Sequence, residues 1–126
     1  MSTLRVNTLA NQGGTQSTAI ENAINGSAKA WVNFDGTGTV AIRTSYNVSS
    51  ITDNGTGLFG INFINAMPDA DYVIVGGCNR ENNSNSPGVC GIRRDTASTT
   101  TVANVSTSDD SGTTIDNQKT HFAIFR

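Results

Sequence analysis

Three side chains of this sequence could supply a cysteine–histidine catalytic dyad: His121 with Cys78 or Cys90. A hydrolase needs a nucleophile, a general base that activates it and a group that orients the base. His121 is the only histidine of the chain, and we expect it in the last strand, next to Phe122. No Gly-x-Ser-x-Gly sequence supplies a serine nucleophile, and nothing near either cysteine indicates an activated thiol. We therefore expect no catalytic centre and no enzyme activity.

Carboxylates offer a second possible chemistry, because enzymes that cleave glycans use a pair of them. Asp69 and Asp71 flank Ala70 and would share one face of an extended segment. They directly follow Pro68, however, at a position where the chain enters a strand and where solvated aspartates are common. The pattern favours a turn over a catalytic pair.

Metal and cofactor sites have weaker support in the sequence. Asp53-Asn54-Gly55 resembles the start of a calcium loop but lacks the glutamate that closes the twelve-residue pattern. Two cysteines and one histidine cannot supply the four ligands of a structural zinc site. We therefore predict no metal ion and no cofactor.

The two cysteines have a possible pairing of their own. If residues 72–78 and 89–94 pair as a hairpin, Cys78 lies directly across from Cys90 and a disulfide can form. The alternative is a pair of reduced, partly buried thiols, which a reducing cytosol favours. The residues alone leave both possibilities open.

Binding is better supported than catalysis, because two long polar loops are expected on a β scaffold. Residues 79–88 and 106–114 are rich in amides, hydroxyls and short charged side chains, which suit a hydroxyl-rich ligand but suit water equally well. The alternative is a pair of loops that are merely tolerated. The candidate receptor-binding residues are Arg80, Glu81, Asn82, Asn83, Asn85, Asp109 and Asp110.

Two kinds of element are expected to position these loops. Residues 1–28 predict a short strand over 4–8 and one helix, for which Thr18 and Glu21 form a capping box and Gly26 is the terminator. Residues 29–126 predict a β domain in which Ala30, Val32 and Phe34 share one face. The continuous apolar run at 72–77 predicts a central strand covered on both faces. The expected strands are 29–34, 39–43, 46–51, 59–63, 72–77, 89–94, 99–105 and 120–125.

About eight short strands with regular turns favour a small antiparallel β-sandwich or barrel, preceded by the one short helix. Trp31 lies on the strand face opposite Val32 and Phe34. It therefore packs either on the helix or on a neighbouring subunit. Leu4 and Val6, in the tethered N-terminal strand, are further candidates for a subunit interface.

The charge balance excludes several functions. Only 14% of the 126 residues are charged, and the net charge is −2. Disordered chains usually carry a high net charge, and sequence-independent nucleic-acid binding needs a basic surface. We therefore expect a folded domain that binds no nucleic acid.

The apolar runs fall far short of the about 20 residues of a membrane span, and the N-terminus lacks the regions of a signal peptide. We expect synthesis in a cytosol and no membrane insertion.

Three separated blocks of the sequence carry a family resemblance. They are residues 29–43 (KAWVNFDGTGTVAIR), residues 46–57 (YNVSSITDNGTG) and the Asn62-Phe63, Ala66-Met-Pro-Asp69 and Tyr72 positions. Together with the opening STLRVN of residues 2–7, they resemble a domain of tail fibre proteins of tailed bacteriophages, particularly marine and cyanobacterial phages. The resemblance covers residues 2–77, and residues 78–126 do not share it.

The resemblance implies a non-enzymatic structural protein of the virion, located in the tail fibre. It implies a β-rich homotrimer that contributes to adhesion and host recognition, with other virion tail proteins and bacterial surface polysaccharide as partners. Such domains usually end longer fibres, so the short chain leaves an alternative. That alternative is a decoration (cement) protein that reinforces the capsid or tail.

Overall fold

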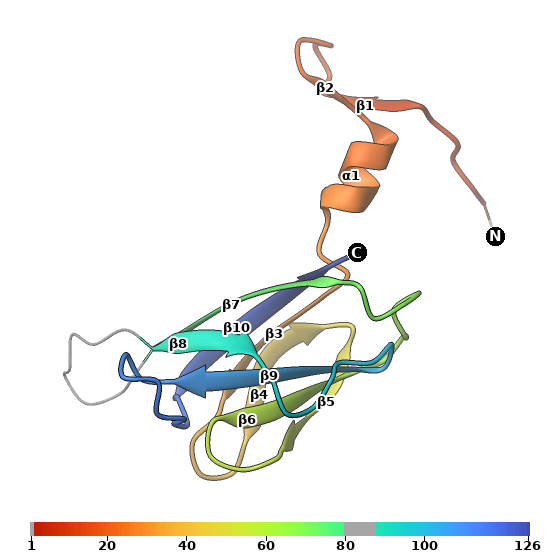
Figure 1. The fold of residues 1–126 in the computed structure, drawn as a ribbon. Helices are drawn as coiled ribbons and strands as arrows, with labels where there is room; N and C mark the ends of the chain where they lie inside the picture. Colours follow the sequence, from red (N-terminus) through yellow and green to blue (C-terminus); the bar gives the residue numbers. More distant parts are fainter. Residues whose placement is uncertain (1, 80–87) are drawn as a thin grey trace.

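The structure, a computed structural model, describes residues 2–79 and 88–126. Two four-stranded antiparallel sheets face each other, and a small hairpin and one short helix precede them (Figure 1). The first sheet has the order β4-β3-β10-β7, and the second has the order β5-β6-β9-β8. The strands of the first sheet are β3 (Ala30–Asp35), β4 (Ala41–Tyr46), β7 (Val73–Asn79) and β10 (Lys119–Phe125). Those of the second sheet are β5 (Val48–Asp53), β6 (Leu58–Phe63), β8 (Val89–Ile92) and β9 (Val102–Ser108).

This architecture confirms the predicted mainly-β fold and distinguishes between the two predicted forms, a sandwich and a barrel. Within residues 2–79 and 88–126, no ladder of hydrogen bonds joins one sheet to the other. The domain is therefore an open sandwich and not a closed barrel, and each sheet keeps two edge strands.

The N-terminal segment forms a hairpin that leads into the helix. β1 (Thr8–Ala10) pairs with β2 (Ser17–Ala19), and α1 (Ile20–Gly26) follows directly. The helix and its end at Gly26 are confirmed, but the predicted capping box was wrong. Thr18 pairs with Leu9 in the ladder, so Ala19 occupies the N-cap position without a side-chain cap bond. The strand predicted over residues 4–8 was also wrong, because pairing begins only at Thr8.

Asn47 turns the chain from the first sheet into the second. It has a φ of 53°, in the left-handed region that asparagine tolerates better than most residues. Its Nδ2 donates to the carbonyl oxygens of Lys29 and Asn65, each at 3.1 Å, and its Oδ1 accepts from the Asn65 amide at 2.8 Å. The side chain thus fastens the start of β3 to the end of β6 at the corner between the sheets.

The core lies between the inner faces of the two sheets. The alternation predicted for the first strand is confirmed, because Ala30, Val32 and Phe34 are all at most 1% exposed. Across the sandwich, the rings of Phe34 and Phe59 meet edge to face, with centroids 5.1 Å apart. The buried hydrophobic residues are Ala30, Val32, Phe34, Val48, Phe59, Ile61, Phe63, Met67, Tyr72, Ala103, Val105, Phe122 and Ile124.

β7 lies at the edge of the first sheet, so the prediction of a central strand covered on both faces was wrong. Ile74 packs partly against the core, whereas Val73 and Val75 are 60% and 49% exposed. Successive strand residues face opposite sides, and the outer side of this strand is open to solvent. An apolar run shows that both faces of a strand are apolar, not that both are covered.

Tyr72 joins the segment before β7 to the second sheet. It is 8% exposed, and its ring meets that of Phe63 edge to face at 5.8 Å. Its hydroxyl lies 2.9 Å from the Thr99 carbonyl oxygen and 3.0 Å from that of Val102. Burial raises the pKa of this phenol above its ordinary value, which further favours the protonated form that donates hydrogen bonds.

Candidate functional site

The outer face of the first sheet presents two rows of side chains aligned by the strand register. Directly paired residues of antiparallel strands lie on the same face. The first row is mostly aromatic and aliphatic and consists of Tyr46, Trp31, Ala123 and Val75. The second row is polar or small and consists of Thr44, Asn33, His121 and Gly77. Tyr46 is 58% exposed and Trp31 is 38% exposed, so the aromatic row is open to solvent.

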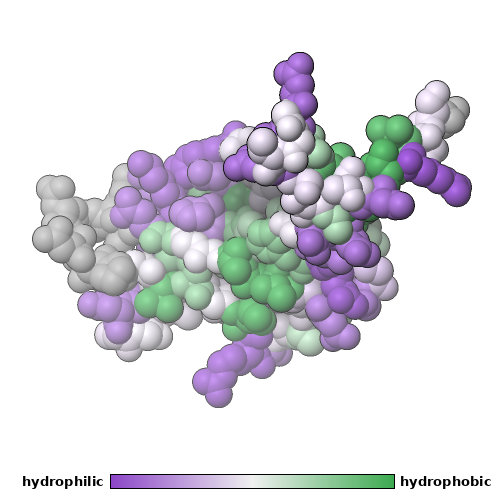
Figure 2. Space-filling view, turned by 90° about the horizontal axis from the view of Figure 1, so that it is seen from above, coloured by the Kyte–Doolittle hydropathy of each residue, from purple (hydrophilic) through white to green (hydrophobic). Residues whose placement is uncertain are grey.

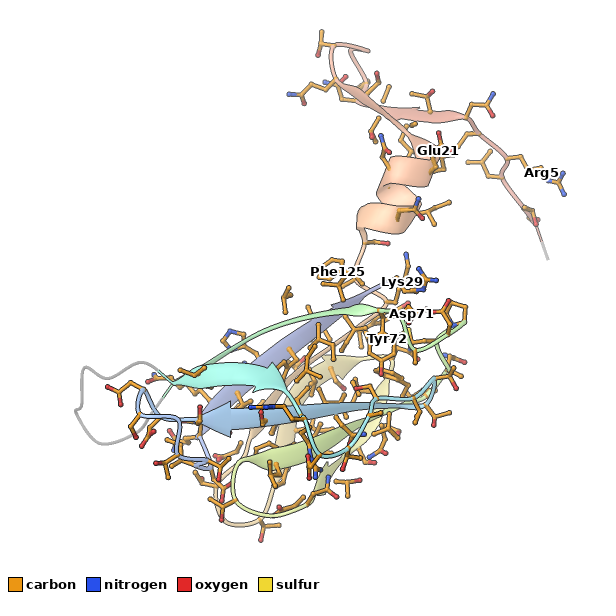
Figure 3. All side chains as sticks on the ribbon, viewed as in Figure 1. Arg5, Glu21, Lys29, Asp71, Tyr72 and Phe125 are labelled. Carbon is orange, nitrogen blue, oxygen red and sulfur yellow. The ribbon has the colours of Figure 1, made fainter. Side chains whose placement is uncertain are left out.

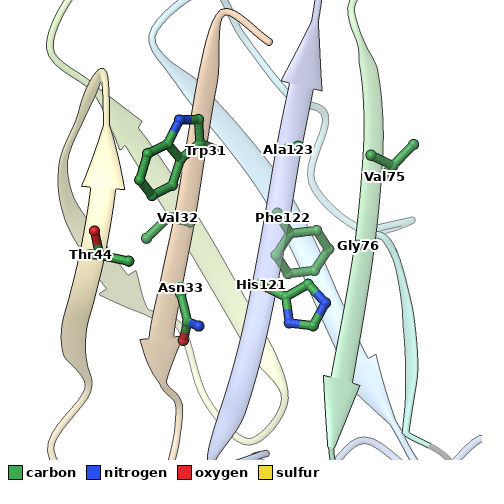
Figure 4. A pocket seen from close by; sticks show the side chains of 9 residues that line it. All are labelled: Trp31, Val32, Asn33, Thr44, Val75, Gly76, His121, Phe122 and Ala123. Carbon is green, nitrogen blue, oxygen red and sulfur yellow. The ribbon is translucent and has the colours of Figure 1, made fainter.

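An open groove of about 530 Å³ lies over these rows; we call it the outer groove (Figure 4). Its lining residues are Trp31, Val32, Asn33, Thr44, Val75, Gly76, His121, Phe122 and Ala123. None of them is an aspartate, glutamate, lysine or arginine. The lining therefore combines an indole, an amide, a hydroxyl and an imidazole without a fixed charge, which suits a neutral ligand with hydroxyl groups.

Two consecutive glycines of β7 make room for the ring side chains of β10. A Cβ on Gly77 would lie 2.7 Å from His121 Nε2, on the outer face. A Cβ on Gly76 would lie 2.3 Å from the Phe122 ring, on the inner face. The His121 imidazole can lie across the edge strand only because Gly77 has no side chain. The Gly-Gly pair within an apolar run was a signal for this site that sequence reasoning missed.

Asn33 contributes an unsatisfied acceptor beside the groove. Its Oδ1 is buried and has no hydrogen-bond partner among the described residues. A buried polar atom without a partner carries a desolvation cost. Because this oxygen is shielded from solvent, a ligand in the groove can reach it only if the Asn33 side chain moves.

His121 lies apart from the groups that would activate it. The described lining of the outer groove contains no carboxylate and no thiol. Cys78 of β7 pairs with buried Thr120 of β10 and so faces the interior. His121 is next to Thr120 in β10 and therefore lies on the opposite face of the sheet. The geometry therefore does not bring a cysteine and this histidine together as a dyad.

The hairpin that would have placed Cys78 directly across from Cys90 does not form. β7 pairs with β10 and β8 pairs with β9, so the two cysteines belong to different sheets. Both residues are free cysteines of intermediate burial.

The described flanks of the two predicted receptor-binding loops lie at one end of the sandwich. Arg80, Glu81, Asn82, Asn83 and Asn85 lie outside the described residues. Their flanks are described: Asn79 pairs with Lys119, and Val89 pairs with Ser108. Asp109 follows directly, and its Oδ1 accepts bonds from the Ser111 amide and hydroxyl and from the Thr113 amide, at 2.6–3.0 Å. This carboxylate therefore shapes its own turn, while Asp110 is exposed.

The predicted interface residues of the N-terminal segment are open to solvent. Leu4 is 84% exposed and Val6 has intermediate exposure. α1 has no buried residue, and Ile24 on its surface is 55% exposed. The segment projects from the sandwich near Lys29 (Figure 3), and no residue of α1 lines the outer groove. Trp31 was expected to pack either on the helix or on a neighbouring subunit. The structure does not show it packed on the helix.

A hydrophobic area is visible on the side from which this segment projects. Figure 2 shows hydrophobic side chains gathered over the middle of the sandwich, bordered by hydrophilic ones. The exposed large hydrophobic residues of the first sheet are Trp31, Ile42, Tyr46, Val73 and Val75. An apolar surface of this kind is typical of a binding or assembly site.

The carboxylates that were possible catalytic or calcium-binding groups form hydrogen bonds within turns instead. Asp69 Oδ1 accepts from the Asp71 amide at 2.9 Å, and Asp69 also forms an ion pair with Arg126. Asp53 Oδ1 accepts from the Gly55 amide at 2.9 Å. Within the described residues, no three His, Cys, Asp or Glu side chains come together where they could hold a metal ion.

No helix in the described part of the chain is long and apolar enough to cross a membrane. In comparisons with protein-family models, curated proteins and solved structures, the chain matches none.

Proposed function

We propose that this chain is a non-enzymatic adhesion module of a bacteriophage virion. In this proposal it is a homotrimeric tail fibre component that binds a neutral polysaccharide of the bacterial surface through the outer groove. The phage assignment depends on the sequence resemblance of residues 2–77. The binding assignment depends on the groove.

The observation that carries the binding proposal is the uncovered Trp31 beside three polar side chains. An indole offers a flat apolar surface for the C–H face of a sugar ring, and Trp31 is 38% exposed for such a contact. Asn33, Thr44 and His121 add donors and acceptors for hydroxyl groups. They come from three neighbouring strands of one sheet, so the backbone ladder holds them in fixed relative positions.

The N-terminal segment supports the trimer. α1 has seven residues, whereas isolated helices shorter than about 12 residues are marginal in water. It buries none of its residues in the single chain, and Leu4, Leu9 and Ile24 remain exposed. Contacts with neighbouring copies would bury these residues and stabilise the helix, which assigns assembly to residues 2–28 and binding to the sandwich.

Cell labelling tests the adhesion proposal. The fluorescently labelled full chain is expected to bind host cells, and Trp31→Ala is expected to weaken this binding by about tenfold or more, as for truncation of a buried aromatic anchor. Ile64→Ala is the matched control, because Ile64 is 65% exposed and lies outside the groove. Equal loss of binding in both variants, or none in either, would contradict the groove assignment.

Light scattering and electron microscopy test the virion assignment. The full chain should have the mass of a trimer in solution, and Leu4→Asp combined with Val6→Asp should shift it towards the monomer. Immunogold particles should label the tails of intact virions. Labelling across the capsid would instead support the decoration protein, and a monomer would overturn the trimer.

A further inference from the structure

The two cysteines lie on the two edge strands that face each other across one open side of the sandwich. β7 is the last strand of the first sheet, and β8 is the last strand of the second. Cys78 pairs with Thr120, and Cys90 pairs with Thr107. Both threonines are fully buried. Because directly paired residues share a face, both sulfur atoms point into the space between the sheets.

The two side chains are close enough for each thiol to influence the pKa of the other. Cys90 also packs against the hydrophobic core. Gly88 lies against the same place, since a Cβ there would be 2.6 Å from Cys78 Sγ. The two thiols therefore share the inter-sheet space at the edge formed by β7 and β8, where a disulfide would link the sheets.

We propose that Cys78 and Cys90 form a redox-dependent disulfide that joins the two sheets at this open edge. The oxidant is a low-molecular-weight disulfide, such as oxidised glutathione. One protein thiolate attacks that disulfide, which gives a mixed disulfide and releases one reagent thiolate. The second protein thiolate then attacks the protein sulfur of the mixed disulfide and releases the second reagent thiolate. The protein loses two electrons and two protons, and the reagent becomes two thiols.

The bond would close the gap that the backbone leaves open. No ladder joins β7 to β8 in the described residues, so the two sheets are held together there by side-chain packing. The disulfide would close a ring from residue 78 to residue 90, a loop length for which cross-links typically stabilise proteins. The oxidised chain is expected to melt about 10 °C higher than the reduced chain. The proposal does not depend on the identity of the ligand or the location of the protein.

The test compares the full chain after incubation with oxidised glutathione and after reduction. Burial raises the pKa of both thiols, so the incubation is done at about pH 8.5, where more thiolate is present. Peptide mapping should find residues 78 and 90 in one disulfide-linked pair within a single chain. Cys78→Ser and Cys90→Ser should each lose both the linkage and the gain in melting temperature.

Three outcomes would overturn the proposal. They are two thiols that both remain free for alkylation, glutathione attached stably to either cysteine, or cross-linking only between chains. Because the mapping is done on the natural sequence, it decides the question even if a serine variant fails to fold.

Discussion

Asn47 shows how one side chain can determine the corner between two sheets. It combines a left-handed backbone with four side-chain hydrogen bonds to Lys29 and Asn65. Asn47→Gly keeps the backbone conformation but removes the bonds, and should cost about 2 kcal/mol. Asn47→Ala also strains the backbone and should cost about 1 kcal/mol more. Urea unfolding measures both free energies, and an alanine variant as stable as the glycine variant would contradict the role of the positive φ.

Gly57 is required both by its backbone conformation and by its neighbours. Its φ is +68°, and a Cβ there would lie 2.3 Å from the Thr107 carbonyl oxygen and 2.8 Å from the Ile115 amide. Gly38 has a similar φ of +59° but open space around it. Gly38→Ala should therefore cost about 1 kcal/mol, and Gly57→Ala about 3 kcal/mol or more, in thermal or urea unfolding. Similar losses at the two positions would show that the close approach of the backbones is unimportant.

At the scale of elements, the end of β10 is held to the turn before β7. The Arg126 guanidinium and, to a smaller extent, the Asp71 amide hold the pKa of Asp69 below its usual value by hydrogen bonding. A carboxylate with a lowered pKa in the folded state contributes stability above the pKa of the unfolded state, about 3.9. That stability is lost as the pH falls through the lower, folded pKa.

The melting temperature of the native chain should therefore fall more steeply between about pH 4 and pH 2 than that of Asp69→Asn. The difference should be small, because the pair is exposed to solvent. Asp110→Asn is the control, since Asp110 is exposed and forms no ion pair within the described residues. Parallel curves for the native chain and Asp69→Asn would contradict the role of the Arg126 pair.

The elements that could be predicted are those whose signals are local. Alternation placed Ala30, Val32 and Phe34 inward, and the glycine-rich turn at 53–57 separates β5 from β6 as expected. The edge position of β7 could not be predicted, because the covering of a strand depends on segments distant in sequence. The prediction of a capping box was wrong for a related reason, because Thr18 pairs with Leu9 and belongs to a strand. The groove depends on register across four strands, which no local pattern specifies.

At the scale of the whole molecule, the sandwich has one exposed aromatic face and one projecting N-terminal segment. The two have different chemistry: the outer groove mixes polar and aromatic groups, whereas Leu4, Leu9 and Ile24 of the segment are aliphatic. This separation is why we assign ligand binding to the first and assembly to the second. Composition alone predicted a turn-rich β domain with little charge, but it did not indicate which face is open.

The central claim, that the outer groove binds a neutral polysaccharide, has a direct optical test. Trp31 is the only tryptophan of the chain, so its fluorescence reports on the groove without any label. Titration of the full chain with purified, neutral host surface polysaccharide should shift or quench this emission saturably, and His121→Ala should weaken the apparent affinity by several-fold while Ile64→Ala leaves it unchanged. An emission spectrum that does not change, although calorimetry shows that the polysaccharide binds, would place the ligand elsewhere on the molecule and contradict the account.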